Sequence, residues 1–133
     1  RVEQVATPQD IYWRPSSAYI AKFLGLNNLL PIQGWQAEQA ITPIGRFSLS
    51  HTSAHKDDLH SILLHPDGIH VVTEHAQLHG TVRERVFQGR NYRIAVQTDT
   101  NRWLRFSVLS RQDVPPVGTE VGLACDYVVG LQA

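Results

Sequence analysis

The stretch YRIAVQTDTNRWLRFSV, residues 92–108, constrains the fold of this chain more than any other segment. Apolar residues occupy every second position on both sides of its centre: Tyr92, Ile94 and Val96, then Leu104, Phe106 and Val108. Because successive side chains of a strand point to opposite faces, each run presents one apolar face. Asp99, Thr100 and Asn101, between the runs, are residues that turns favour. The stretch therefore predicts a β-hairpin with one face in the core.

The same type of pattern extends over most of the chain after Asn28. TVRERVFQG precedes the hairpin and VGTEVGLACDYVVGLQ follows it, and short extended runs are separated by Gly, Pro, Asn and Asp. Gly80, Gly89 and Gly118 are expected to mark turns or bulges. Closing antiparallel strands into a barrel removes exposed sheet edges. We therefore predict a mainly β fold, a small antiparallel barrel.

The beginning of the chain follows a helical pattern instead. Thr7 can cap a helix, Pro8 fits its first position, and Asp10 carries a negative charge in its first turn. Pro15 disfavours helix at the residue before it, so this helix is expected to be short.

A second helix is predicted directly afterwards. Ser16 or Ser17 can cap it, and Gly25 is a natural end. One stripe of this helix is apolar: Tyr19, Ile20, Phe23 and Leu24.

Length and composition indicate one globular domain. The chain has 133 residues, of which 42% are hydrophobic, and equal numbers of basic and acidic residues. Its apolar runs are far shorter than the ~20 residues that cross a bilayer, so no direct membrane insertion is expected. Cys125 is the single cysteine, which excludes an intramolecular disulfide and favours a reducing compartment. Arg1 stands where a methionine would begin a complete protein, and we expect a piece of a longer one.

Three segments resemble the ATP-binding subunits of bacterial ABC importers. In that family a stretch reading Q-x-G-T-P-x-E-I-Y-x-x-P, then V-A-x-F-x-G and N, leaves the nucleotide-binding domain. The corresponding residues here are Gln4, Thr7, Pro8, Asp10, Ile11, Tyr12, Pro15, Ala21, Phe23, Gly25 and Asn28. Ala6 replaces the usual glycine and Asp10 the usual glutamate. LLHPDGIHV resembles the family's RPE strand, with His65 where arginine is usual, and GTVRERVFQGRNYRIAV resembles the hairpin of its C-terminal TOBE domain.

This resemblance implies an architecture and a role. Residues 1–26 would be connector helices from the end of the nucleotide-binding domain, and residues 27–133 a TOBE-type barrel with an oligonucleotide-binding-like fold. The barrel would stabilise or modulate a homodimer of the ATPase subunit. The parent protein would contact transmembrane permease subunits through its nucleotide-binding domain, on the cytoplasmic side of the inner membrane. NNLLP and TPIGRF resemble ferric iron importers, although sulfate, polyamine, phosphonate and sugar systems share the architecture.

No catalytic residue is predicted within the chain itself. A phosphate-binding loop reads G-x-x-x-x-G-K-[ST], but the two lysines, Lys22 and Lys56, follow Ala21 and His55. The resemblance therefore places ATP and Mg²⁺ in the nucleotide-binding domain of the parent, and no cofactor in this chain. Nothing resembles the G-x-S-x-G segment that would position a nucleophilic serine.

The histidines invite a metal-site hypothesis, because six of the seven lie between His51 and His75. Four of them recur every five residues, an odd step that would place neighbours on opposite faces of a strand: His60, His65, His70 and His75. We therefore predict no metal site. Pro66 and Gly68 form a break at which a turn could still bring His65 and His70 together as metal candidates.

Arginines concentrate in and around the hairpin, where residues 81–111 hold seven arginines against Glu84 and Asp99. Trp103 should lie beside Arg93 and Arg105 on the outer face, and these three are our candidates for a protein interface. A solvated charged face is the simpler interpretation, and we expect no nucleic-acid partner.

An alternative from a different class is a free-standing module that binds a small oxyanion or single-stranded nucleic acid. The Ser-Ala-Arg-Asn type segment of oxyanion binders is missing, and FQGRNY resembles it only loosely.

Overall fold

A computed structural model describes residues 7–52 and 54–133 of the chain, so Gln4 and Ala6 of the first motif lie outside the described residues. The helices are α1 (Pro8–Trp13) and α2 (Ala18–Phe23), with single 3-10 turns at η1 (Lys56–Asp58) and η2 (Pro66–Gly68). The strands are β1 (Leu29–Pro31), β2 (Gly34–Gln36), β3 (Gln39–Thr42), β4 (Gly45–Ser48), β5 (His51–Thr52), β6 (Ser61–Leu64), β7 (Ile69–Val72), β8 (Leu78–Phe87), β9 (Asn91–Thr98), β10 (Trp103–Leu109), β11 (Glu120–Cys125) and β12 (Val128–Leu131).

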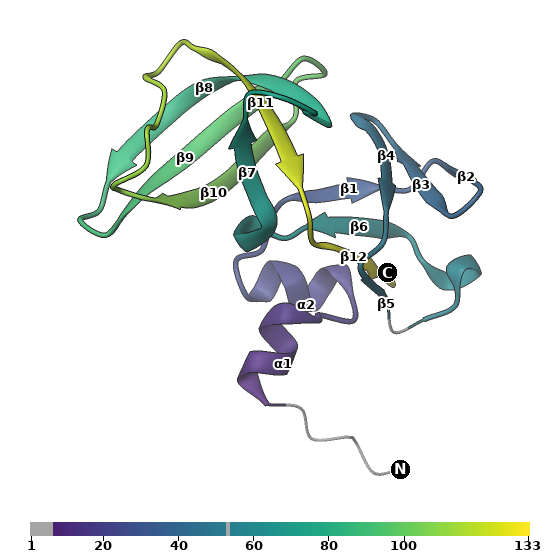
Figure 1. Ribbon diagram of the computed structural model, residues 1–133. Coiled ribbons are helices and arrows are strands. Elements are labelled where there is room, and N and C mark those ends of the chain that lie inside the picture. Colours follow the sequence, from purple (N-terminus) through teal and green to yellow (C-terminus); the bar gives the residue numbers. More distant parts are fainter. Residues whose placement is uncertain (1–6, 53) are drawn as a thin grey trace.

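The strands form three sheets, which together make up the β region of the chain. A five-stranded sheet has the order β10-β9-β8-β11-β7, a four-stranded sheet the order β1-β6-β12-β5, and β2-β3-β4 form a smaller sheet. Figure 1 shows the five-stranded sheet at one end of the molecule, with both helices beneath the β6 and β12 strands at the other. Named strands pair antiparallel except for β12 with β5. The prediction of a mainly β, oligonucleotide-binding-like fold is confirmed, and this parallel pair is an addition to it.

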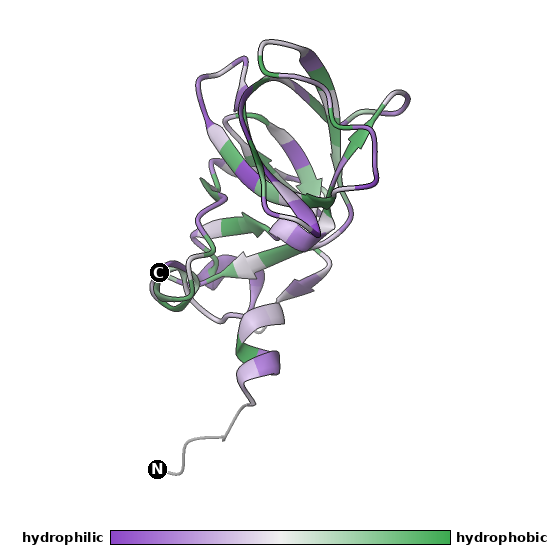
Figure 2. Ribbon diagram, turned by 90° about the vertical axis from the view of Figure 1, so that its left-hand side faces the viewer, coloured by the Kyte–Doolittle hydropathy of each residue, from purple (hydrophilic) through white to green (hydrophobic). Residues whose placement is uncertain are grey.

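The predicted hairpin is present with its predicted faces. β9 and β10 pair so that Ile94 lies opposite Phe106 and Val96 opposite Leu104, and all four are buried. Asn101 adopts the left-handed conformation in the turn, with φ 68°. Figure 2 shows hydrophobic and hydrophilic residues interleaved along the strands of the molecule.

The caps that the sequence predicted also form. The Thr7 hydroxyl accepts a hydrogen bond from the Asp10 amide at 3.1 Å, and the Asp10 carboxylate accepts one from the Thr7 amide at 3.4 Å. Ser17 is the cap of α2, since its hydroxyl accepts from the Ile20 amide at 3.2 Å. Gly25 ends the second helix with φ 78°, a conformation that glycine adopts without strain.

One continuous hydrophobic core joins the three sheets. Its buried members come from each of them, and include Leu30, Phe47, Ile62, Leu64, Val82, Ile94 and Leu123. A second cluster fixes the helices to the four-stranded sheet through Ala21, Leu26, Leu63, Val129 and Leu131. The boundary that the resemblance drew between residues 26 and 27 stays a prediction.

Asn28 connects two of the sheets from a buried position, where 3% of its surface is exposed. Its side-chain amide donates to the carbonyl of Arg105 at 2.8 Å and to that of Leu64 at 3.2 Å. Its side-chain oxygen accepts from the Arg105 amide at 2.8 Å. Because β10 is an edge strand, the two bonds to Arg105 occupy backbone groups on the side of β10 that faces no neighbouring strand of its sheet.

Two positions differ from what the sequence suggested. Gly80 lies within β8 and not at a turn or a bulge, because the bulge of this strand falls between Val82 and Glu84. The apolar stripe of the second helix is mostly outside the core: Tyr19 is 75% exposed and Phe23 is 79% exposed. Among the described residues, no helix is both long and apolar enough to span a membrane.

Candidate functional site at the junction of helix and barrel

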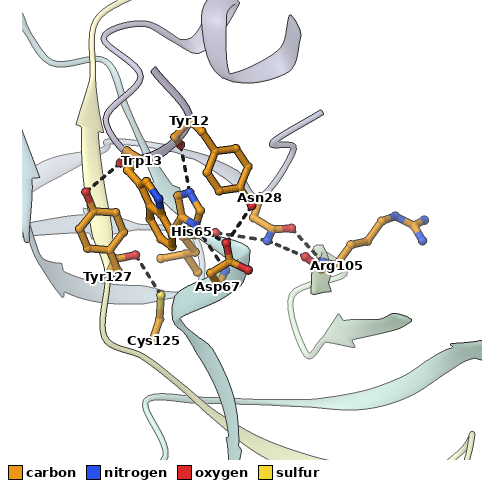
Figure 3. A network of polar contacts seen from close by, with 9 residues as sticks. Tyr12, Trp13, Asn28, His65, Asp67, Arg105, Cys125 and Tyr127 are labelled. Atoms are coloured by element: carbon orange, nitrogen blue, oxygen red, sulfur yellow. Dashed lines mark hydrogen bonds and ion pairs between the residues drawn. The ribbon is translucent and has the colours of Figure 1, made fainter. Parts of the chain in front are cut away.

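The ring of His65 lies at the centre of the junction between α1 and the barrel. His65 follows β6 and precedes η2, where Pro66 fixes the first turn and the Asp67 amide donates to His65 Nδ1 at 3.3 Å. The residue is 0% exposed. The HPDG segment thus turns the chain and points a histidine inward, toward the helix (Figure 3).

Both ring nitrogens have partners, which defines the proton arrangement. Nδ1 accepts from Asp67, so Nε2 carries the hydrogen and donates to the backbone carbonyl of Tyr12 at 3.1 Å. This arrangement requires the neutral imidazole. Burial lowers the pKa of His65 below its usual value, because it disfavours the cation, while the Tyr12 carbonyl and the Asp67 carboxylate partly offset this effect.

Aromatic rings enclose the imidazole. Trp13 stacks on it, with ring centres 4.7 Å apart and planes within 16°. Tyr12 and Tyr127 meet it edge-on, with ring centres 4.9 Å and 5.5 Å away. These contacts come from α1 on one side and from the segment before β12 on the other, so the histidine is packed between the helix and the barrel.

The carbonyls at the end of α1 are held by barrel side chains. Residues at a helix C-terminus have carbonyls without helical partners, and Pro15 has no amide to extend the ladder. His65 takes the Tyr12 carbonyl, and the Tyr127 hydroxyl donates to the Trp13 carbonyl at 2.7 Å. We call the set of Tyr12, Trp13, His65, Asp67 and Tyr127 the helix clamp. It caps the helix and attaches it to the barrel in the same contacts.

The Asp67 carboxylate completes the helix clamp at its outer side. The Tyr12 hydroxyl donates to it at 2.8 Å, and burial together with this bond raises the pKa of Tyr12 to about 12. The same carboxylate lies 3.9 Å from His65 Nδ1. A groove of about 510 Å³ runs along this side of the junction and is lined by Trp13, Asp67 and Tyr127 among others.

Cys125 lies close by, in surroundings that disfavour its thiolate. Its thiol is buried and donates to the Tyr127 carbonyl at 3.4 Å. Burial raises the pKa of Cys125 to about 11, so the thiolate that a nucleophile or a metal ligand needs is disfavoured. The thiol is a packing element of the junction.

The two histidines considered as metal candidates occupy different surroundings. His65 is buried with both nitrogens engaged, whereas the exposed ring of His70 contacts Asp126 at 2.9 Å. Within residues 7–52 and 54–133, no three His, Cys, Asp or Glu side chains gather in a way that could hold a metal ion. The turn at Pro66 directs His65 into the helix clamp, while His70 pairs with Asp126. That the two histidines form no metal site stays a prediction.

The structure places Arg93, Trp103 and Arg105 on one outer face of the five-stranded sheet. Trp103, Arg105 and Ser107 are two residues apart along β10, so they share one face of the strand. Arg93 of β9 lies opposite Ser107 and therefore belongs to the same face. Trp103 is 42% exposed. The Arg105 guanidinium lies 5.4 Å from the centre of the Trp103 ring and forms an ion pair with Glu84 at 3.1 Å. The guanidinium thus lies over the Trp103 ring and is itself paired, and the expected absence of a nucleic-acid partner stays a prediction.

Sequence reasoning singled out His65 and did not find its partners. Tyr12 and Trp13 carried no burial signal, because the period of a six-residue helix is too short to define a face. Tyr127 lies within a stretch predicted to form strands, and its partner Trp13 is 114 residues earlier in the chain. The departure from arginine at His65, which the resemblance noted, was the one available signal.

Comparison with known proteins identifies the type of domain. Residues 62–127 match the family described as the TOBE domain. The chain is 28% identical over 125 residues to the spermidine/putrescine import ATP-binding protein of Clostridium novyi, with 92% of this chain and 34% of the relative covered. It is 30% identical over 132 residues to the Fe(3+) ions import ATP-binding protein of Streptomyces coelicolor, with 97% and 37% covered. The chain thus spans about a third of the length of the curated relatives it matches.

Proposed function

The chain is a TOBE-domain region of the kind found in ABC importer ATP-binding subunits, and on that premise we propose that it regulates the ATPase of such a subunit. In this proposal the barrel is the C-terminal part of the subunit. ATP and Mg²⁺ bind in the nucleotide-binding domain that precedes it. The subunit lies at the cytoplasmic side of the membrane and contacts permease subunits there. The relatives' names mention two cargoes, ferric ions and polyamines, and the NNLLP and TPIGRF segments favour ferric iron.

The observation that carries the proposal is the helix clamp. It holds the backbone of α1 through His65 and Tyr127, so a displacement of the helix is transmitted to the barrel and the reverse. If α1 continues from the nucleotide-binding domain, the barrel limits how that domain moves during the ATP cycle. A flexible linker would transmit much less.

The exposed stripe of α2 supports the same proposal. Tyr19 and Phe23 are four residues apart, so they lie on one face, and both are more than two-thirds exposed. Large apolar pairs of this kind are typical of contact surfaces. We propose that the nucleotide-binding domain of the same subunit covers this stripe.

We expect the double substitution Tyr19→Ser with Phe23→Ser to reduce ATP hydrolysis by the full-length subunit several-fold. Burying each ring against the nucleotide-binding domain would contribute about 2 kcal/mol, so losing both shifts docking strongly toward the detached state. The measurement is the steady-state ATPase rate together with thermal unfolding of the barrel, which should change little because both rings lie outside its core.

Val117→Ser is the matched control, because Val117 is 58% exposed in a loop of the barrel and away from the helices. It should leave the ATPase rate unchanged. An equal loss in the control, or a full-length protein that does not hydrolyse ATP, would contradict the proposal.

We further propose that Arg93, Trp103 and Arg105 contribute to contact between the barrels of an ATPase homodimer. Such a contact would keep the two nucleotide-binding domains at high effective concentration when they separate between cycles.

Trp103→Ala should raise the dimer dissociation constant about tenfold, as expected for an exposed tryptophan anchor beside arginines. Sedimentation equilibrium of the full-length protein without nucleotide measures this constant. Arg111→Ala, in the loop after β10, should not change it, and an unchanged constant for Trp103→Ala would contradict this assignment.

A further inference from the structure

We propose that the helix clamp is a proton-sensitive latch, in which protonation of His65 loosens the hold of the barrel on α1. This inference concerns the regulation of the junction and rests on the proposed function only for its effect on the ATPase. The latch itself follows from the hydrogen bonds of the ring.

Only Nδ1 of the His65 ring can take up an additional proton, and protonation there removes a hydrogen bond. The Nε2 position already carries a hydrogen toward the Tyr12 carbonyl, so a second proton binds at Nδ1. Nδ1 is the acceptor for the Asp67 amide at 3.3 Å. After protonation two donors face each other, and that bond is lost.

The nearest charge cannot compensate without opening a second contact. The Asp67 carboxylate lies 3.9 Å from Nδ1 and can approach the cation only by turning. It accepts the Tyr12 hydroxyl at 2.8 Å, so turning toward His65 weakens that bond. The first response loses the bond within the HPDG turn that orients the ring, and the second weakens the bond from Tyr12 of α1 to the barrel.

The groups around the ring favour the neutral form overall. Those that face it are Tyr12 from α1, Asp67 from η2, and Tyr127 from the segment after β11, while Cys125 at the end of β11 meets the backbone of His65. Asp10, Arg14 and Asp126 are charged residues that line the groove outside it. The stacked Trp13 ring and the end of α1 favour a cation, but complete burial works against one and lowers the pKa of His65.

The direction of the effect follows from this lowered pKa. A detached, solvated His65 takes up a proton near pH 6.5, whereas the docked ring does so only at lower pH. The clamped state is therefore fully favoured above about pH 6.5 and loses stability as the pH falls below it. The loss levels off once the docked ring is protonated too. Within that window, detachment should increase up to about tenfold for each pH unit.

The experiment is hydrogen–deuterium exchange of the full-length protein that carries this chain, followed by mass spectrometry of the peptide that contains α1. After correction for intrinsic exchange with an unfolded reference peptide, exchange should be faster at about pH 5.5 than at about pH 7.5, by up to about tenfold. His65→Gln retains a donor and an acceptor but does not titrate, so its corrected exchange should not depend on pH. His70→Gln removes the exposed histidine paired with Asp126 and should behave as the unsubstituted protein does.

A second variant keeps the test decisive if His65→Gln loosens the helix clamp at every pH. Asp67→Asn removes the carboxylate that partly stabilises the docked cation, so the pH at which the loss levels off should move lower. The onset near pH 6.5, which the detached ring sets, should stay the same. Three results would overturn the latch. They are a transition that persists in His65→Gln, a levelling-off pH that Asp67→Asn does not lower, and the absence of any transition in the unsubstituted protein. The ATPase rate tests the proposed function separately. If exchange follows the prediction while the ATPase pH profile is the same in His65→Gln, the latch stands and the coupling to the ATPase is contradicted.

Discussion

Substitution of Asn28 by alanine is expected to lower the free energy of unfolding by about 3 kcal/mol. The side chain makes three hydrogen bonds to backbone groups of Arg105 and Leu64. Alanine makes none of them, and the buried site leaves little room for water to replace the amide. Each buried backbone group left without a partner costs about 1–3 kcal/mol, and a small cavity adds to the total. Urea unfolding followed by circular dichroism measures the change.

Asn27→Ala is the matched control, because the neighbouring asparagine is exposed. Its substitution should change the free energy of unfolding by less than about 0.5 kcal/mol. Asn28→Asp separates the donors from the acceptor, since aspartate can still accept from the Arg105 amide but cannot donate to the two carbonyls. It should be at least as destabilising as alanine, because it also buries a charge. A change below 1 kcal/mol in Asn28→Ala would show that these bonds do not join the sheets.

Local features of this fold could be predicted from the sequence because their causes are local. The caps at Thr7 and Ser17 depend on residues three positions away, and the alternation in residues 92–108 specifies its own core face. The resemblance added the order of the segments and the barrel, and the TOBE match over residues 62–127 confirms that identification.

The helix clamp could not be predicted in the same way, because it joins residues that only the topology brings together. His65 lies 53 positions after Tyr12, whose carbonyl it binds, and Asn28 lies 77 positions before Arg105. Side chains that bond to backbone leave no pattern of residue types, since any residue supplies a carbonyl. A buried histidine also gives the same sequence signal as an exposed one, which is why the cluster from His51 to His75 suggested metal chemistry first.

The apolar stripe of α2 shows a different limit of sequence reasoning. Periodicity identified the residues correctly, but it cannot tell whether an apolar face meets the core of its own chain or another surface. In this chain Ala21 faces the core, while Tyr19 and Phe23 point away from it. A short helix that turns a small side chain toward the barrel and its large side chains away from it fits a segment packed between the barrel and a second protein surface.

We expect Gly80→Ala to destabilise the chain by about 2–4 kcal/mol, the second large effect. A Cβ atom at Gly80 would lie 2.6 Å from Val96 Cγ1 and 2.7 Å from the Gln97 carbonyl oxygen. The first contact involves a fully buried core side chain and the second involves the backbone of β9, so neither can move away cheaply. Position 80 of β8 is a glycine because β9 approaches it closely, and not because the chain turns there.

Gly34→Ala supplies the control with the opposite expected sign. Gly34 also lies in a strand, as the first residue of β2, but a Cβ atom there would meet only Ile41 Cδ1, at an ordinary distance of 3.8 Å. Alanine restricts the unfolded chain more than glycine does, so this substitution should be neutral or stabilise by up to about 1 kcal/mol. Urea unfolding of both variants decides the matter. Equal effects at the two positions would mean that backbone entropy, and not the close approach of β8 to β9, explains the glycine at position 80.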